Sequence, residues 1–215
     1  MIHSLKHGIG TAIGVAFLCL VANGWSVRAQ SPAPPRMGPI PAEAMTEAQA
    51  KAAKEVERNG AVQGYLWPML RDPGLARLTQ DMATFINRDS KLPKKLTQLT
   101  IIYVSRRFMY NESWAEHVQV AQRQGLRPEI AQAIASGQRP ADMDQDEQIV
   151  YDMCTELDHT MAISDATYAR AVARLGEAGV VDTIATYGYY AYLGLFNNAT
   201  HLPSGAAPAF HPAAR

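Results

Sequence analysis

Residues 92–125 read LPKKLTQLTIIYVSRRFMYNESWAEHVQVAQRQG, and this stretch decides the fold. Pro93 stands where a first helical turn accepts proline, and Gly125 stands where a helix ends. Between them apolar residues recur three or four positions apart, which is the period of an amphipathic helix. The stretch therefore predicts one long central helix, with Asn111 as the place where it could kink.

Polar side chains gather on one face of this predicted helix. At about 100° per residue, a group of them falls within roughly a third of a turn. They are Gln98, Arg106, Tyr110, Ser113 and His117, with Glu112 at the margin. A cluster of this kind on an otherwise apolar helix face is typical of a binding or catalytic site, so these residues are candidates for one.

The rest of the chain after residue 45 is also predicted to be helical. Thr46 and Gln49 form a capping-box pair, and Ser164 caps a later helix. No segment of useful length alternates apolar and polar residues as a strand does. The fold class is therefore predicted to be all-α, with residues 46–203 as one domain. The expected helices cover residues 46–60, 73–87, 92–125, 128–137, 146–159, 164–176 and 180–197.

The two ends of the chain are predicted to lie outside this domain. Residues 1–29 combine Lys6, an apolar run and small residues before Gln30, which is typical of a cleaved signal peptide; an uncleaved anchor is the alternative. Residues 30–45 are expected to form an extended, mobile, proline-rich linker, and residues 204–215 a disordered tail. A cleaved signal predicts export to a bacterial periplasm or secretion, with no membrane association afterwards.

Composition narrows the classes of function. The formal net charge is +0, which provides no electrostatic footprint for nucleic acid or an anionic membrane. The cysteines are Cys19 and Cys154, and cleavage of the signal leaves Cys154 alone. A single thiol forms no internal disulfide and runs no two-thiol redox cycle by itself. Because Cys154 sits in an apolar helix, we expect it to be a buried small hydrophobe.

Three motifs follow one another in residues 92–126: Leu-Pro-x-x-Leu-x-x-Leu-x-Ile, then Trp-x-x-His, then Ala-x-x-x-Gly-Leu. This order resembles the carboxymuconolactone decarboxylase family, whose relatives include alkylhydroperoxidase D. The resemblance implies an alkylhydroperoxidase D-like helical bundle over residues 46–203, and homo-oligomers (trimers or hexamers) with sites near subunit contacts. The likeness continues in VQGYLWPML at 62–70, IVYDMCTEL at 149–157, SDATYA at 164–169, LGEAGVV at 175–181 and GYY at 188–190.

Three positions depart from the peroxidase branch of that family, which uses Cys-x-x-Cys-x-x-x-His with a glutamate upstream. Ser113 and Tyr110 stand at the two cysteine positions, and Gln98 stands at the glutamate position. The thiolate is the nucleophile of that chemistry, and neither serine nor tyrosine replaces it. Peroxidase activity of the peroxiredoxin type is therefore not expected, and the branch without the cysteine pair is the better likeness.

The resemblance to this decarboxylase branch implies a lyase acting on a small carboxylated lactone or a related acid. Loss of carbon dioxide leaves an electron pair that an unsaturated carbonyl absorbs as a dienolate, so the site needs a cation, a dry pocket and a proton donor. His117 is the candidate general acid/base, because histidine titrates near neutrality. One histidine without convergent ligands predicts no metal, and no cofactor is expected. The candidate substrate-binding residues are Gln98, Arg106, Tyr110, Ser113 and Glu112, with Arg106 orienting the carboxylate.

A second class of function stays open, namely a small-molecule-binding or scaffold homologue that kept the fold and lost the chemistry. A lone histidine on a helix more often makes structural hydrogen bonds than it catalyses. Trp114 is expected to pack, and Arg106 is expected more often in a salt bridge than as a substrate clamp. Tyr189 and Tyr190 could line the pocket or belong to the core or a subunit interface.

Overall fold

The computed structural model describes residues 34–202, which form helices and connecting turns without a strand. The described residues confirm the predicted all-α class. The predicted signal peptide (1–29) and tail (204–215) lie outside the described part of the chain. The longer helices are α1 (Glu47–Glu55), α2 (Pro73–Thr84), α3 (Lys94–Arg107), α4 (Asn111–Arg123), α5 (Pro128–Ala135), α6 (Gln145–Thr160) and α7 (Asp165–Thr200). The short ones are η1 (Ala42–Ala44), η2 (Gly64–Leu66), η3 (Met69–Arg71) and the π-helical η4 (Phe85–Asp89).

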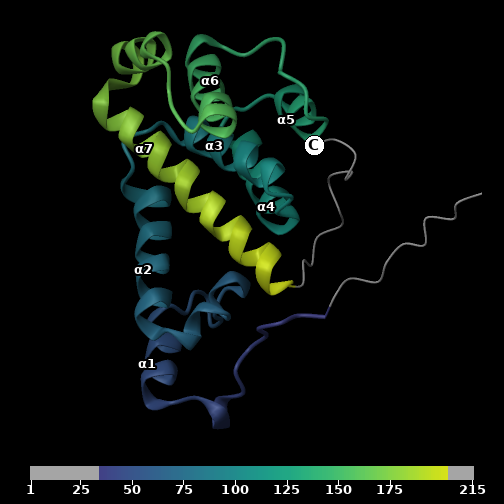
Figure 1. Cartoon of the computed structure of the whole chain (residues 1–215), viewed down its shortest axis with the longest axis vertical. Coiled ribbons are helices and arrows are strands. Elements are labelled where there is room, and N and C mark those ends of the chain that lie inside the picture. Colours follow the sequence, from purple (N-terminus) through teal and green to yellow (C-terminus); the bar gives the residue numbers. More distant parts are fainter. Residues whose placement is uncertain (1–33, 203–215) are drawn as a thin grey trace, which may run out of the picture. The chain divides into compact units, whose positions relative to one another are not determined.

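Helix α3 is the element around which the others are arranged (Figure 1). Most of its side chains from Leu96 to Arg106 are buried. It contacts α4, α5, α6 and α7, while α1 and α2 pack against each other and against η3. Because α3 is buried on nearly all sides, its buried residues go beyond a single apolar stripe. They include the polar residues Thr97, Gln98, Thr100, Ser105 and Arg106.

The prediction of one helix across residues 92–125 is wrong, because the chain turns between α3 and α4. Met109 has a φ of 55°, in the left-handed region, and a residue in that conformation ends a right-handed helix. The Tyr110 N–H donates to the Ser105 carbonyl at 2.8 Å and closes the turn. Helix α4 then folds back along α3, so that Ser113 lies against Ser105.

The starts of α1 and α7 follow the predicted capping signals, whereas the Asp144 cap of α6 was not predicted. Thr46 and Gln49 form the capping box of α1, and Ser164 caps α7. Asp72 caps α2 directly before the proline that occupies its first turn. Each cap accepts from backbone N–H groups that the first helical turn leaves without a partner.

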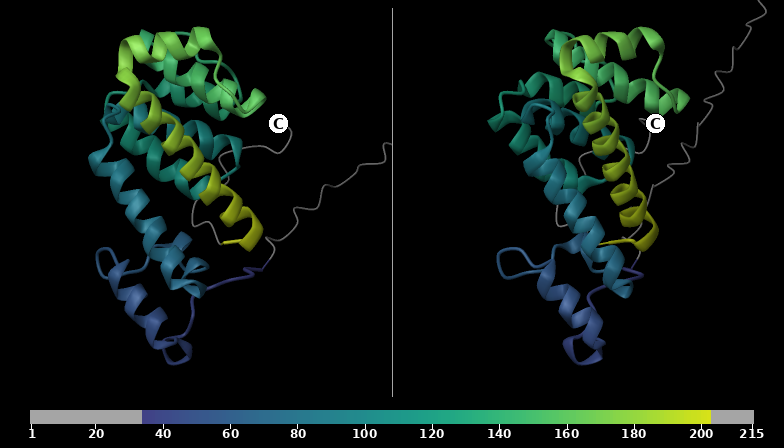
Figure 2. Two further views of the ribbon diagram at one scale, coloured as in Figure 1. Left: turned by 60° about the vertical axis from the view of Figure 1, so that its left-hand side comes forward. Right: turned by 90° about the vertical axis from the view of Figure 1, so that its left-hand side faces the viewer.

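Helix α7 consists of two limbs that meet at Gly176, whose φ of 70° and ψ of 168° are not helical. This agrees with the separate helices predicted for residues 164–176 and 180–197. The second limb crosses the molecule toward α2 (Figure 2). There the Tyr189 hydroxyl donates to the Thr79 carbonyl at 3.0 Å. Helix α7 thereby connects the α3–α6 region with the α1–α2 region.

Gly194 brings α7 directly against the turn between α3 and α4. A Cβ atom at position 194 would lie 2.6 Å from the Cβ of Phe108, a distance that leaves no room for a side chain. Tyr110, at the other end of the turn, is buried. Helix α7 therefore packs against the turn that sets the direction of α4.

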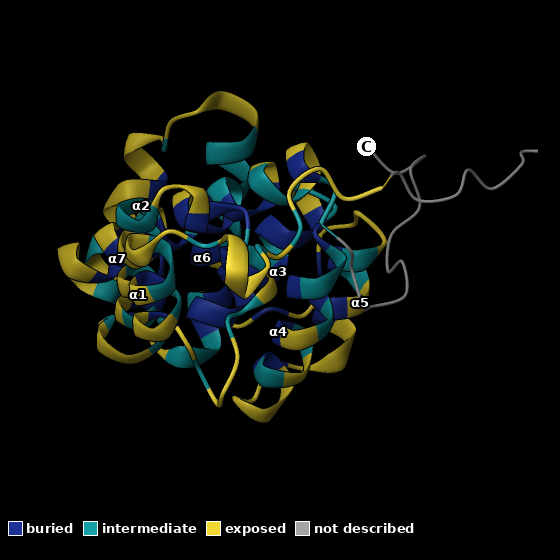
Figure 3. Ribbon diagram, turned by 90° about the horizontal axis from the view of Figure 1, so that it is seen from below, coloured by how far each residue is buried: buried dark blue, intermediate teal, exposed yellow. Residues whose placement is uncertain are grey.

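Several large apolar side chains of α2, η4 and α7 are exposed, although buried residues concentrate around α3 and α6 (Figure 3). Leu78 and Phe85 are 68% and 40% exposed, while α2 buries small and polar residues such as Ala76 and Thr79. On α7, the exposed apolar residues are Val181 (61%), Ile184 (41%) and Leu195 (59%). These five side chains, called here the apolar face, recur at helical spacing on the outer side of each helix.

The described part of the predicted linker, residues 34–45, makes hydrogen bonds with the domain. The Arg36 N–H donates to the Thr200 carbonyl at 2.8 Å, and the Arg71 guanidinium donates to the Gly38 carbonyl at 3.0 Å. A freely mobile linker would not make these bonds, which attach the segment to the end of α7 and to η3. Within residues 34–202, no helix combines the length and the apolar character needed to cross a membrane.

Candidate functional site

His117 lies in the interior between three helices. Its Nδ1 is 2.7 Å from Oε1 of Gln98 on α3, and its Nε2 is 3.2 Å from the hydroxyl of Tyr190 on α7. The Tyr190 ring also stands edge-on to the imidazole, with 5.2 Å between ring centroids. The structure thus brings Gln98 and His117 together and adds Tyr190, which the sequence placed either at the pocket or in the core.

The partners of the imidazole fix its protonation state. An amide oxygen only accepts hydrogen bonds, so Nδ1 carries the proton and Nε2 accepts from the Tyr190 O–H. Burial lowers the pKa of His117 from 6.5 to about 4, because the charged form loses its hydration. The ring is therefore neutral at neutral pH, with the basic nitrogen on the Tyr190 side.

A pocket of about 120 Å³ opens beside His117. Tyr110, Glu112 and Ser113, all predicted site residues, line it together with His117. Gln98 supports the imidazole from behind. The remaining lining residues are Arg58, Gln63, Gly64, Tyr65, Ala83, Asn87, Glu116, Tyr189, Tyr190 and Leu193. Segments far apart in the sequence therefore form one polar and aromatic pocket.

The predicted residues on α4 and at its start differ in their surroundings. The Ser113 hydroxyl shares a 2.8 Å hydrogen bond with that of Ser105, which ties it to α3. Burial raises the pKa of Tyr110, so its phenol stays protonated. Burial also raises the pKa of Glu112, and the nearby Glu116 adds to this shift. The pocket thus contains a carboxyl group that keeps its proton to higher pH than an ordinary glutamate.

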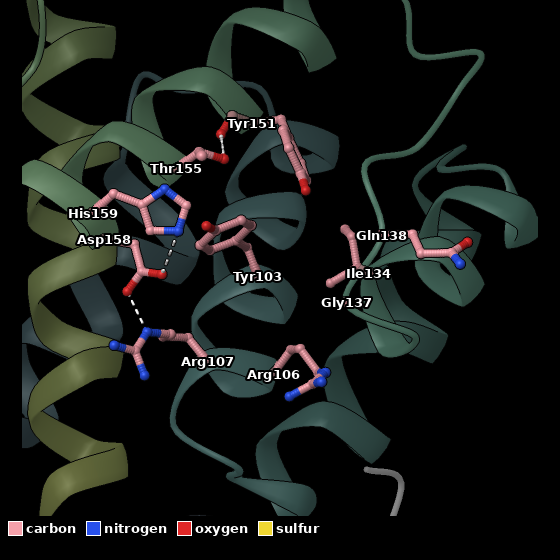
Figure 4. Close-up of a pocket in the computed structure, with 10 residues that line it drawn as sticks. All are labelled: Tyr103, Arg106, Arg107, Ile134, Gly137, Gln138, Tyr151, Thr155, Asp158 and His159. Carbon is pink, nitrogen blue, oxygen red and sulfur yellow. Dashed lines mark hydrogen bonds and ion pairs between the residues drawn. The ribbon is translucent and has the colours of Figure 1, made fainter. Parts of the chain in front are cut away.

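Arg106 does not lie in this pocket. It is buried, donates its Nε–H to the Ala135 carbonyl at 2.9 Å, and lines a different cavity between α3, α5 and α6 (Figure 4). A continuous helix would have placed Arg106 and His117 on one face, but α4 folds back along α3 and that face is interrupted. Arg58 supplies a cation to the His117 pocket instead.

Arg58, Tyr65 and Asn87 line the pocket but were not predicted. Arg58 and Tyr65 lie between α1 and η3, and Asn87 lies in η4, all far from His117 in sequence. Neither a helical period nor a fixed spacing relates them to α4. The one sequence signal near Arg58 and Tyr65 was the resemblance of residues 62–70 to the decarboxylase family, and it assigned no role to a side chain.

Two further findings bear on the interpretation of the pocket. Among residues 34–202, no group of three or more His, Cys, Asp or Glu side chains is arranged to hold a metal ion. Comparisons with family models, curated proteins and solved structures gave no match for this chain.

Proposed function

We propose that this chain is a carboxy-lyase of the carboxymuconolactone decarboxylase type, with an alkylhydroperoxidase D-like fold, acting on a small carboxylated lactone or related acid. His117 is the general acid/base in this proposal. The observation that carries it is the hydrogen-bonded series Gln98–His117–Tyr190 at the wall of a small pocket. This series orients one imidazole nitrogen, as proton transfer at a fixed atom requires.

The lyase reaction breaks the bond between the ring carbon and the carboxylate and releases carbon dioxide. The electron pair moves into the unsaturated carbonyl, and a ring carbon of the resulting dienolate then takes a proton. An anionic substrate beside His117 would favour the imidazolium form, because an opposite charge raises the pKa of a histidine. The ring can then donate the proton that the dienolate needs.

Arg58 takes the carboxylate-orienting role that the sequence assigned to Arg106. It lines the pocket, whereas Arg106 lines another cavity. A guanidinium binds a carboxylate with two parallel hydrogen bonds, which orients as well as attracts it. The tendency of Glu112 to stay protonated reduces its repulsion of an anionic substrate.

Thiol peroxidase chemistry has no support in this site. Tyr110 and Ser113 occupy the positions of the family's cysteines, and Cys154 is fully buried elsewhere. Burial raises the pKa of the Cys154 thiol to about 12, so the reactive thiolate does not form at neutral pH. Cys154 packs as the small hydrophobe that the sequence predicted.

A binding-only homologue is the second candidate, and one observation favours it. Both nitrogens of His117 already have protein partners, Gln98 and Tyr190. A substrate that reacts at Nε2 must therefore displace or share the Tyr190 hydroxyl. In either case the proposal includes export on the predicted signal and assembly into homo-oligomers, as the resemblance implies.

The test is to incubate the purified protein with an unsaturated carboxylated lactone and follow its ultraviolet absorbance and the release of carbon dioxide. We expect turnover that falls at least a hundredfold in His117→Ala, because general acid/base catalysis contributes about that much or more. His159→Ala is the matched control, since His159 is exposed and not in the pocket. Saturable binding without turnover would favour the binding-only homologue, and full activity in His117→Ala would remove the role given to His117.

A further inference from the structure

A second cavity, of about 520 Å³, opens between α3, α6 and the end of α5. It shares no lining residue with the pocket at His117, and its volume falls in the range of sites that hold small organic molecules. Nothing in the proposed lyase reaction uses this cavity. A ligand of this cavity would therefore bind apart from the lyase site.

The charged side chains that line the cavity are already engaged by the protein. Arg107 is ion-paired with Asp158, and Nε2 of His159 lies 3.7 Å from the same carboxylate. Arg106 donates to the Ala135 carbonyl at 2.9 Å and has further protein partners. An ionic ligand would have to displace one of these partners or bury its own charge unpaired, and either change costs free energy. The charges of the lining therefore favour an uncharged ligand.

One wall of the cavity is aromatic and uncharged. The rings of Tyr103 on α3 and Tyr151 on α6 meet edge to face, with 5.3 Å between their centroids. Burial raises the pKa of both phenols, so they keep their protons at neutral pH. The Arg139 guanidinium lies 5.1 Å from the Tyr151 ring centroid and is itself held by a 2.7 Å ion pair to Asp152. Figure 4 shows Ile134 on the α5 side of these rings. A flat ring would fit between the tyrosines and Ile134 with little loss of side-chain freedom.

We propose that this cavity binds a small, uncharged aromatic molecule. Its ring lies between Tyr103, Tyr151 and Ile134, where the tyrosines offer edge-to-face and stacked contacts that a saturated ring does not make as well. An aromatic carboxylate would bring in a charge that the lining does not call for, and inorganic phosphate would in addition leave the aromatic wall unused. The ligand differs in charge from the anionic substrate proposed for the pocket at His117, so the chain binds two different kinds of molecule.

The experiment is a titration of the full chain, labelled with ¹³C at the isoleucine methyl groups, with indole as the probe. Ile134 lines this cavity and no isoleucine lines the His117 pocket, so its methyl signal, assigned with Ile134→Val, reports this site alone. We expect a saturable shift of that signal. Indole-3-carboxylate, which adds a charge to the same ring, should bind at least about tenfold more weakly, because its carboxylate loses water without gaining a partner. Cyclohexanol, which is uncharged but not aromatic, should bind more weakly than indole by about fivefold or more.

Variants test the aromatic wall. Tyr151→Leu should weaken indole binding by about fivefold or more, whereas Tyr151→Phe, which keeps the ring, should retain it. His117→Ala should leave the Ile134 titration unchanged, because the cavity and the lyase site share no lining residue. The comparison of indole with indole-3-carboxylate and cyclohexanol is made on the wild type, so it decides the matter even if Tyr151→Leu does not fold.

Four outcomes would each overturn the proposal. The first is the absence of a saturable shift at Ile134 with indole. The second is binding of indole-3-carboxylate or cyclohexanol as tight as that of indole. The third is unchanged indole binding in a folded Tyr151→Leu variant, and the fourth is loss of the Ile134 shift in His117→Ala.

Discussion

At the scale of single residues, the environment of His117 determines what it can do. Gln98 and Tyr190 saturate its two nitrogens, and burial disfavours its charged form. In this state His117 serves as a neutral hydrogen-bonding group. It becomes a proton donor only when an anion binds beside it and raises its pKa. The same burial links its protonation to the stability of the fold.

His117 should make the protein less stable in acid. The unfolded chain binds a proton at His117 near pH 6.5 and the folded chain near pH 4, so the unfolded state binds more protons in between. The stability contributed by the neutral ring is complete above about pH 6.5 and falls by about 3 kcal/mol as the pH approaches 4. Urea unfolding of the wild type and of His117→Asn from pH 7 to pH 4 measures this. Parallel curves for the two proteins would contradict the assignment.

At the scale of elements, the starts of α1 and α7 were predictable, whereas the turn before α4 was predicted only as a possible kink at Asn111. The side chains of Thr46 and Ser164 cap helix starts, and Gly176 indicates the break between the two limbs of α7. Met109 takes a positive φ without being a residue that favours one, and the apolar period continues through it. The sequence correctly placed Gln98 beside His117, but it did so by assuming one continuous helix, and the two residues in fact lie on the facing helices α3 and α4. The same assumption wrongly placed Arg106 beside His117, because Arg106 lines another cavity.

Gly194 should be intolerant of any side chain, since α7 presses on Phe108 there. We expect Gly194→Ala to cost about 1–3 kcal/mol, as overpacking in a close contact does. Gly188→Ala is the matched control on the same limb, because a Cβ there meets nothing within 4 Å. It should be neutral or stabilising by about 0.5–1 kcal/mol, because alanine favours a helix over glycine. The midpoints of thermal unfolding of the two variants measure these effects. Equal midpoints would contradict the close contact between Gly194 and Phe108.

At the scale of the whole molecule, the pocket at His117 is separate from the larger cavity between α3, α5 and α6. The site at His117 is small and closed in by segments from both ends of the domain, which is why local sequence patterns missed Arg58, Tyr65 and Asn87. The five large apolar side chains of the apolar face on α2, η4 and α7 are each at least 40% exposed. The presence of this face fits the homo-oligomer that the resemblance implies.

We expect the protein to associate through the apolar face. Val181→Lys combined with Ile184→Lys should lower the molar mass measured by light scattering after gel filtration, because it puts two charges into a contact that excludes water. Tyr168→Lys is the control, since Tyr168 is exposed on the other limb of α7. A wild-type protein that runs as a monomer, or a double variant with unchanged mass, would contradict this expectation.

The reverse turn at Met109 also changes how relatives of this site should be sought. In one continuous helix, an inserted residue rotates everything after it by about 100° and destroys a shared face. In a hairpin, a longer turn can absorb an insertion while both arms keep their own faces. The separation of 19 positions between Gln98 and His117 is therefore a property of this turn rather than of the chemistry. A search for the same pair of side chains has to treat the two arms as separate motifs joined by a spacer of variable length.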